Sequence, residues 1–167
     1  MTGLLGLAAL IIVLLMSGWW LSWIATRLDR AHARVERAWA VLDTALVRRA
    51  QQAVEMARQP TVDPATTLLV CDAAGAALEL DLTAAEREQA ESTLSHVLDL
   101  AALSGLEAEQ ERATLARRLY NDAVTTARTI RQRPVVRIFR LAGFAAEPRP
   151  FEMADDQRLV WSGGKER

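Results

Sequence analysis

Residues 4–24 read LLGLAALIIVLLMSGWWLSWI and carry no charged side chain. At a rise of 1.5 Å per residue, this helix would be about 31 Å long, which matches the hydrocarbon layer of a bilayer. Trp19, Trp20 and Trp23 gather at its C-terminal end, and indole rings favour the headgroup boundary. The stretch therefore predicts a transmembrane helix from Leu4 to Ile24, with Leu15 near its middle.

Two other structures fit this stretch less well. A cleaved signal peptide has a basic start and a shorter apolar run, whereas this start lacks Lys and Arg and Trp-Leu-Ser-Trp-Ile is a poor cleavage context. A buried core helix does not normally run this far without a charge. Because four arginines follow the span, the positive-inside rule predicts a short N-terminus outside and a C-terminal domain in the cytoplasm. These are Arg27, Arg30, Arg34 and Arg37.

Outward from the span, the pattern predicts an all-α fold. Residues 27–59 contain no Pro or Gly before Pro60, so one helix is expected to continue out of the membrane. Leu28, Val35 and Leu42 recur every seven residues, which predicts a coiled-coil-like seam. The seam is expected to weaken at Arg49, where a core position becomes charged.

Three further helices are expected after Pro60. Asp63-Pro64 is typical of a helix start, and that helix should end near Leu80. The sequence Thr83-Ala-Ala-Glu86 predicts a capping box for the next helix, which Ser104-Gly105 should close. A fourth helix is expected from about Glu107 to Gln132, before Pro134.

These elements predict a single N-terminal transmembrane helix followed by an antiparallel long-helix bundle of three to four helices. The expected domains are a membrane anchor over 1–26, a helical bundle domain over 27–146 and a mostly disordered tail over 147–167. Ala and Leu dominate the composition, and both lose little side-chain freedom in helices. Nineteen of the twenty basic residues are Arg, which together with the Ala content favours a bacterial source with a GC-rich genome and so a bacterial cell membrane.

The overall charge of −1 conceals a strong segregation. Residues 59–111 carry eleven acids and one Arg, whereas residues 112–146 carry eight Arg and one acid. Acidic helices packing beside basic ones in a bundle explain this distribution. A second explanation is that the basic stretch after residue 123 rests on an anionic leaflet. The candidate membrane-surface residues are Arg128, Arg131, Arg133, Arg137, Phe139 and Arg140.

The sequence contains no pattern that predicts an active site. Cys71 is the only cysteine, and His32 and His96 are the only histidines, so neither a catalytic residue, a metal site nor a cofactor is predicted. Glu86, Glu88 and Glu91 are expected to form a solvated acidic face. Tyr120-Asn121-Asp122 places polar groups within a helix, which predicts a hydrogen-bonding role between helices of the bundle.

Several short motifs give the chain a resemblance to a known family. They are Val35–Trp39, the Arg48-Arg49 pair, Arg117–Val124 with Tyr120-Asn121-Asp122, then Ile130, Pro134, Gly143-Phe144 and Pro150–Glu152 with Phe151. In this order they resemble the LemA family of bacterial membrane proteins. The resemblance implies an N-terminal anchor, an antiparallel bundle, a cytoplasmic domain and no established enzymatic activity. The chain departs from the family pattern at Ala50–Glu55, where the segment that usually follows the paired Arg is replaced.

The function expected from these features is a membrane-anchored helical scaffold or adaptor that acts through protein–protein contacts at the cytoplasmic face. Its expected partners are membrane lipid and an unknown protein, with a second copy of the chain among the candidates. The alternative is a membrane-surface protein that organises anionic lipid through its Arg-rich segment. Nucleic-acid binding is not expected, because the domain is not basic overall and has no aromatic stacking platform.

The orientation can be tested by cysteine accessibility. With Cys71 replaced and a new Cys placed near the C-terminus, we expect an impermeant thiol reagent to label permeabilised cells and not intact ones. The physical reason is the cluster of Arg that directly follows the span. Labelling of intact cells would reverse the assignment.

Overall fold

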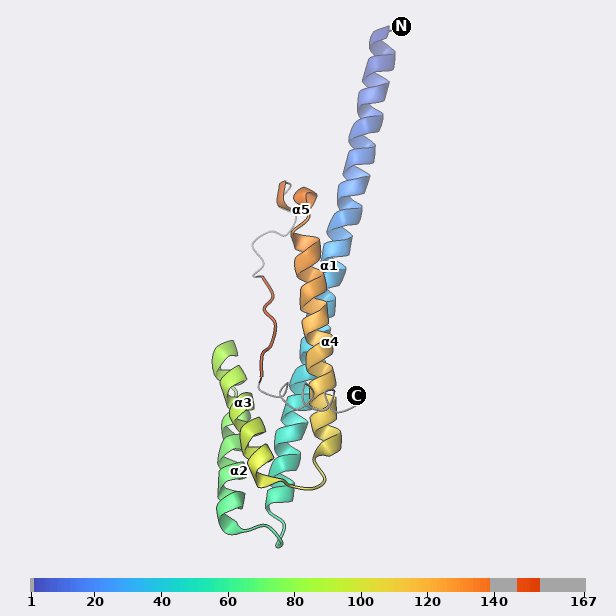
Figure 1. The fold of residues 1–167 in the computed structure, drawn as a ribbon. Coiled ribbons are helices and arrows are strands. Elements are labelled where there is room, and N and C mark those ends of the chain that lie inside the picture. Colours follow the sequence, from blue (N-terminus) through green and yellow to red (C-terminus); the bar gives the residue numbers. More distant parts are fainter. Residues whose placement is uncertain (1, 139–146, 154–167) are drawn as a thin grey trace, which may run out of the picture. The chain divides into compact units, whose positions relative to one another are not determined.

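The computed structural model describes residues 2–138 and 147–153, and it confirms the all-α prediction for them (Figure 1). Within these ranges there are helices and no strand. The helices are α1 (Thr2–Ala57), α2 (Pro64–Ala77), α3 (Ala84–Ala101), α4 (Glu107–Arg131) and α5 (Pro134–Ile138). The short α5 was not predicted. Pro134 ends α4, as expected, and is also the first residue of α5, where its fixed φ and missing N–H are tolerated.

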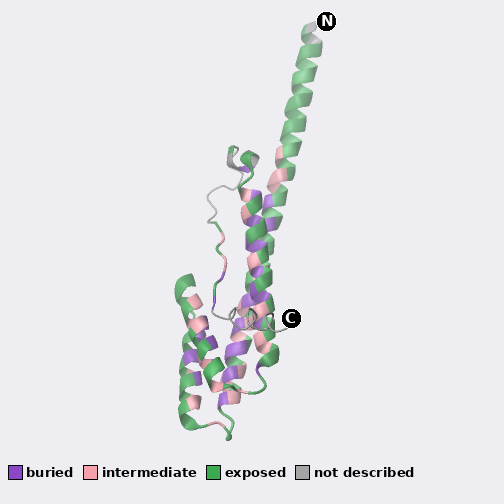
Figure 2. Ribbon diagram, viewed as in Figure 1, coloured by how far each residue is buried: buried purple, intermediate pink, exposed green. Residues whose placement is uncertain are grey.

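Helix α1 confirms that the apolar stretch continues without a break into the following helix. It runs for 56 residues. Its N-terminal part is exposed on every side (Figure 2), since the consecutive side chains from Leu10 to Met16 are all exposed. Among the described residues, α1 is the one helix long and apolar enough to cross a membrane. This is compatible with a single-pass membrane protein.

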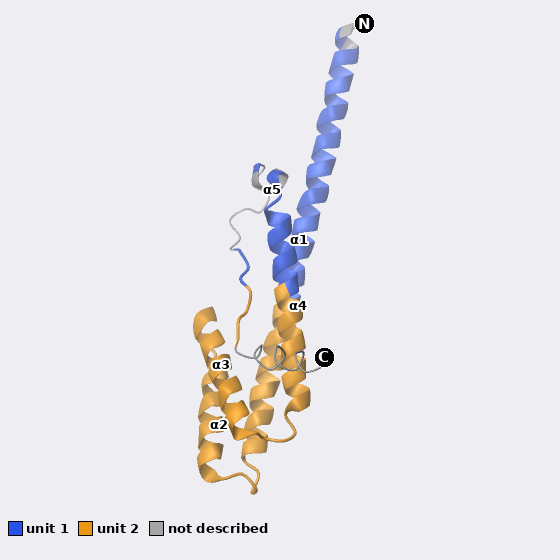
Figure 3. Ribbon diagram, viewed as in Figure 1, with its two compact units in different colours: residues 1–37, 122–149 blue, residues 38–121, 150–167 orange. Residues whose placement is uncertain are grey.

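The chain forms two compact units, which divide the predicted helical domain 27–146 between them (Figure 3). Unit 1 contains residues 1–37 and 122–149, and unit 2 contains residues 38–121 and 150–167. Helices α1 and α4 each contribute to both units. Each unit is described by itself below.

In unit 1, the start of the α1 seam packs against the end of α4. Leu28 and Ala31 of α1 share a buried cluster with Ala127 and Ile130 of α4 and Val136 of α5. Further toward the C-terminus of α1 and toward the N-terminus of α4, Arg34 Nη2 lies 4.0 Å from Asp122 Oδ2. As the residue number rises along α1 it falls along α4, so the two helices are antiparallel within this unit.

In unit 2, the core is built mainly from alanines. Ala50, Ala53 and Ala57 of α1 are fully buried, and they pack with residues of α2, α3 and the loop before α4. Small side chains let helix axes approach closely, toward the short end of the usual 8–10 Å range. The other members of this core are Val70, Ala73, Ala74, Ala77, Leu94, Leu98 and Leu106.

The predicted helix starts are confirmed. The Asp63 carboxylate accepts hydrogen bonds from the backbone N–H groups of Ala65 and Thr66, both at 3.0 Å. Thr83 and Glu86 form the predicted capping box: Glu86 Oε2 accepts from the Thr83 backbone N–H at 2.8 Å and from its hydroxyl at 2.7 Å. The hydrogen bonds at Thr66 and Thr83 lower the pKa values of Asp63 and Glu86 respectively.

The predicted end of α3 is three residues too long. Ala101 is the last helical residue, and Ala102 takes the left-handed conformation with φ 47°. Gly105, with φ +91°, lies in the following loop, where a Cβ would sit 3.4 Å from Met56 Sδ. Glycine normally takes the left-handed position after a helix, because the Cβ of Ala is sterically disfavoured there. The prediction therefore placed the end of this helix at Ser104-Gly105, whereas Ala102 is the left-handed residue.

The capping box predicts a specific acid sensitivity. Because the folded-state pKa of Glu86 lies below its ordinary value of 4.5, its contribution to stability is complete above that pH and is lost as the pH falls through the folded pKa. We expect the Glu86→Gln variant of the full chain in detergent micelles to lose less of its thermal stability between pH 5 and pH 3 than the parent. Glu55→Gln, at an exposed position of α1, is the matched control and should follow the parent. Parallel acid curves for all three proteins would contradict the prediction.

Candidate functional site

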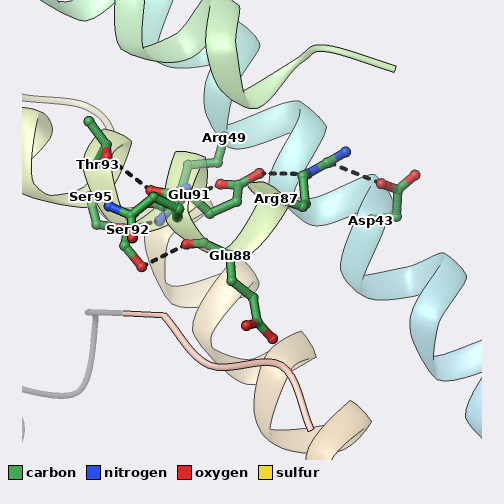
Figure 4. A network of polar contacts seen from close by, with 9 residues as sticks. Asp43, Arg49, Arg87, Glu88, Glu91, Ser92, Thr93 and Ser95 are labelled. Carbon is green, nitrogen blue, oxygen red and sulfur yellow. Dashed lines mark hydrogen bonds and ion pairs between the residues drawn. The ribbon is translucent and has the colours of Figure 1, made fainter. Parts of the chain in front are cut away.

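The heptad seam does not weaken at Arg49, because this arginine is completely buried in unit 2 and paired across the core (Figure 4). Arg49 Nη2 donates to Glu91 Oε2 of α3 at 2.6 Å, and Nη1 donates to Ser95 Oγ at 3.0 Å. The Glu91 side chain is 1% exposed. A charge-assisted bond of this length holds α1 and α3 at one relative position.

The prediction that Glu91 belongs to a solvated acidic face is therefore wrong. Glu91 lies three residues before Leu94 and seven before Leu98, and both leucines are buried in the core. These spacings place it on the core face of α3. Glu91 is the acid on this core face of α3, and Arg49 is the charged residue in the α1 seam. The sequence signal for their pairing is that each is a single charge in line with leucines on the core face of its helix.

A second arginine extends the pair toward the surface. Arg87 Nε lies 3.3 Å from Glu91 Oε1, and Arg87 Nη2 lies 3.1 Å from Asp43 Oδ1 of α1 (Figure 4). The Glu91 carboxylate is thus shared by two guanidinium groups. A shift of α3 by one turn would leave buried charges without partners, which is strongly unfavourable. We infer that this network sets the register of α3 against α1.

An aromatic cluster holds the extended residues 150–153 on the part of unit 2 formed by α1 and α4. Phe151 is 2% exposed, and its ring centroid lies 5.8 Å from that of Trp39, which in turn lies 5.4 Å from that of Tyr120. Asn121 Nδ2 donates to the Phe151 carbonyl at 3.1 Å, and the Phe151 N–H donates to Asn121 Oδ1 at 2.8 Å. Asn121 thus forms hydrogen bonds with an extended segment, whereas the prediction named partners on other helices. The first residues of the predicted tail are folded, and residues 154–167 lie outside the described part.

An apolar groove runs between α1 and α4 on the surface of unit 2. Its volume is about 490 Å³. Ala116 is buried and Ala45 is half-buried, while Val41, Leu115 and Leu119 are 57%, 57% and 54% exposed. Arg48 and the Glu109–Arg112 ion pair line it as well. The small residues leave room for a third helix to approach, and the exposed side chains offer it apolar contacts.

A smaller cleft lies in unit 1, at the end of the apolar part of α1. It has a volume of about 200 Å³ and is lined by Trp20, Trp23, Ile24, Arg27, Ile130, Arg133 and Val136. The Arg27 guanidinium lies 5.8 Å from the Trp23 ring centroid, a cation–π distance. The cleft therefore combines indole rings, aliphatic side chains and two cations.

The structure distributes the predicted site residues among these features. Leu15, Trp19, Trp20 and Trp23 are exposed, Ile24 is half-buried and Leu4 belongs to α1. Arg128 is engaged within unit 1, where it donates to the Pro148 carbonyl at 2.8 Å and pairs with Glu147 at 3.4 Å. Arg131 is half-buried, Arg133 lines the cleft and Asp122 is exposed. The side chain of Arg137, together with Phe139, Arg140, Gly143 and Phe144, lies outside the described residues.

The titratable groups that could carry chemistry are dispersed. In residues 2–138 and 147–153, no three His, Cys, Asp or Glu side chains form a group that could hold a metal ion. His32 Nδ1 lies 3.1 Å from the Leu28 carbonyl of its own helix, His96 is exposed and Cys71 is half-buried.

Comparisons of the chain with models of known protein families, with curated proteins and with solved structures find no match.

The buried pair can be tested by a double-mutant cycle in urea unfolding of the full chain in micelles, followed by circular dichroism. We expect Arg49→Met to lower the free energy of unfolding by about 3–5 kcal/mol, because a buried carboxylate loses a partner. Arg49→Met with Glu91→Leu should recover most of this loss, since no buried charge remains at either position. Arg34→Met is the control at an exposed pair and should cost less than about 1 kcal/mol. Additive losses in the double variant would contradict the pairing.

Proposed function

We propose that this protein is a membrane-anchored helical adaptor of the LemA type in a bacterial cell membrane, which holds a helix of a partner protein in the groove between α1 and α4. The N-terminus lies outside and the helical units lie in the cytoplasm. In this proposal the long helices form an antiparallel bundle, and the chain carries out no catalytic step.

The observation that carries the proposal is the groove itself. Val41, Leu115 and Leu119 are each more than half exposed at one site in unit 2, in a part of the chain that the proposal places in water. Exposed apolar side chains that gather in a groove mark a binding surface more often than scattered ones do. Covering them would remove apolar surface from water at about 25 cal/mol per Å².

The shape and charge of the groove favour an amphipathic helix. Its α1 wall consists of Ala40, Val41, Thr44, Ala45 and Arg48, which lie on one helical face. A groove between two helices that is lined by small residues can accept the apolar face of a third helix. The residues of that third helix that enter the groove are then spaced at i, i+3 or i+4 and i+7. Arg48 has no carboxylate partner among the described residues, so a helix with acidic side chains beside its apolar face fits best.

The anchor supports the cytoplasmic placement. The exposed apolar part of α1 ends at Trp23 and Ile24, and Arg27, Arg30, Arg34 and Arg37 follow directly. Positive charge next to a span favours the cytoplasmic side. A second candidate function, the organisation of anionic lipid by the Arg-rich segment, is favoured by the presence of Arg133 in the cleft with Trp20 and Trp23.

The proposal is tested by photo-crosslinking in native membranes. We expect a photoreactive amino acid at Leu115 to capture a protein segment whose apolar residues follow helical spacing, and the same amino acid at Leu68, which is 72% exposed on α2, to capture it weakly. Leu119→Glu should reduce the adduct at least tenfold, because it places a carboxylate in the apolar groove.

Leu100→Glu is the matched control, since Leu100 is 74% exposed on α3 and lies outside the groove. It should leave the adduct unchanged. Equal adducts from Leu68 and Leu115, or adducts of Leu115 with lipid alone, would overturn the proposal. An adduct with a second copy of the chain would replace the adaptor by a self-associating scaffold.

A further inference from the structure

We propose that the cleft of unit 1 is a binding site for one anionic glycerophospholipid, whose phosphate is held by Arg27 and Arg133 and whose acyl chain lies along Trp20, Trp23 and Ile24. This inference rests on the membrane anchor of the proposed function and is independent of the α1–α4 groove.

The first argument is the depth at which the cleft lies. Trp20, Trp23, Ile24 and Arg27 line it at spacings of three, four and seven residues along α1, so they share one helical face. Three of them belong to the apolar stretch, and Arg27 is the first charged side chain after it. The cleft therefore crosses from the acyl boundary into the headgroup layer, where indole rings are stable.

The second argument is charge. Arg27 and Arg133 come from segments that are far apart in the sequence, yet both line the same hollow. Neither forms an ion pair with a carboxylate of the described residues. Arg128, by contrast, is already engaged by Glu147 and the Pro148 carbonyl. Two guanidinium groups without an acidic partner match a phosphate, which can accept several N–H groups at once.

The third argument is that the cleft walls are held in place before a ligand binds. Ile130 and Val136 are 9% and 1% exposed, and they are anchored in the buried cluster that contains Leu28 and Ala31. The Arg27 guanidinium is positioned over the Trp23 ring. Because the groups are already positioned, a lipid would lose less free energy in ordering them.

Apolar walls distinguish a lipid from a soluble anion. A free phosphate would need only the two arginines, whereas Trp20, Trp23 and Ile24 offer an apolar surface that suits an acyl chain. The site is therefore expected to bind a lipid with an anionic headgroup from the cytoplasmic leaflet, the side on which the proposed function places Arg27. A zwitterionic choline headgroup would place a cation close to the two guanidinium groups and is disfavoured.

The test uses the full chain in detergent micelles, titrated with dioleoylphosphatidylglycerol or dioleoylphosphatidylcholine and analysed by native mass spectrometry. We expect one phosphatidylglycerol to be retained at concentrations that leave phosphatidylcholine unbound. The Arg27→Gln/Arg133→Gln variant should bind phosphatidylglycerol roughly tenfold more weakly. The control Arg30→Gln/Arg37→Gln removes the same charge from exposed positions outside the cleft and should bind like the parent.

Equal retention of both lipids, or equal losses in the two double variants, would overturn the site. In a third titration, glycerol phosphate, which has no acyl chains, competes with bound phosphatidylglycerol. If it displaces the lipid as well as phosphatidylglycerol itself does, the cleft is a site for soluble anions and the lipid proposal is overturned. Alkaline carbonate extraction of cell membranes tests the anchor separately. Release of the chain by carbonate would refute the anchor, whereas retention together with unselective lipid binding would refute the cleft alone.

Discussion

The packing of this protein depends on one constraint, which is that a single helix supplies the surface against which the other helices pack. In unit 1 the α1 seam contributes Leu28 and Ala31. In unit 2 it contributes Leu42, Leu46, Arg49, Ala50, Ala53 and Ala57. No Pro or Gly interrupts it after Trp19 until Pro60. Any break in this helix would remove the shared surface, because α4 in unit 1 and α2 and α3 in unit 2 have their buried residues against it.

Arg49 is the point at which this seam changes its chemistry. A charged residue in a heptad core position normally weakens packing, since burial of an unpaired charge costs several kcal/mol. Here Glu91 and Ser95 accept hydrogen bonds from the Arg49 guanidinium, and Arg87 pairs with the other oxygen of the Glu91 carboxylate. The core around them is made of alanines, whose small and uniform side chains distinguish poorly between neighbouring registers. The ion pair supplies the directionality that such a core lacks.

The segregation of charge along the sequence has more than one structural outcome. Part of the charge forms ion pairs between helices: Glu91 of the acidic segment 59–111 pairs with Arg49 of α1, and Arg87 of the same segment pairs with Asp43 of α1. Another part, Arg27 and Arg133, lines a hollow without a carboxylate partner among the described residues. Arg128 was predicted to be a membrane-surface residue, and its guanidinium donates a hydrogen bond to the Pro148 carbonyl within unit 1.

The sequence by itself determined the elements whose cause is local. The apolar stretch Leu4–Ile24, the start of α2 at Asp63-Pro64 and the capping box at Thr83 follow from composition and from contacts within three or four residues. Tertiary structure decided what depends on distant partners. Glu91 is buried because its helical face meets Arg49, and Phe151 is ordered because Asn121, thirty residues away, accepts and donates to its backbone. A helical face has a known direction within its own helix, but which charged residue it meets is set only when the helices pack.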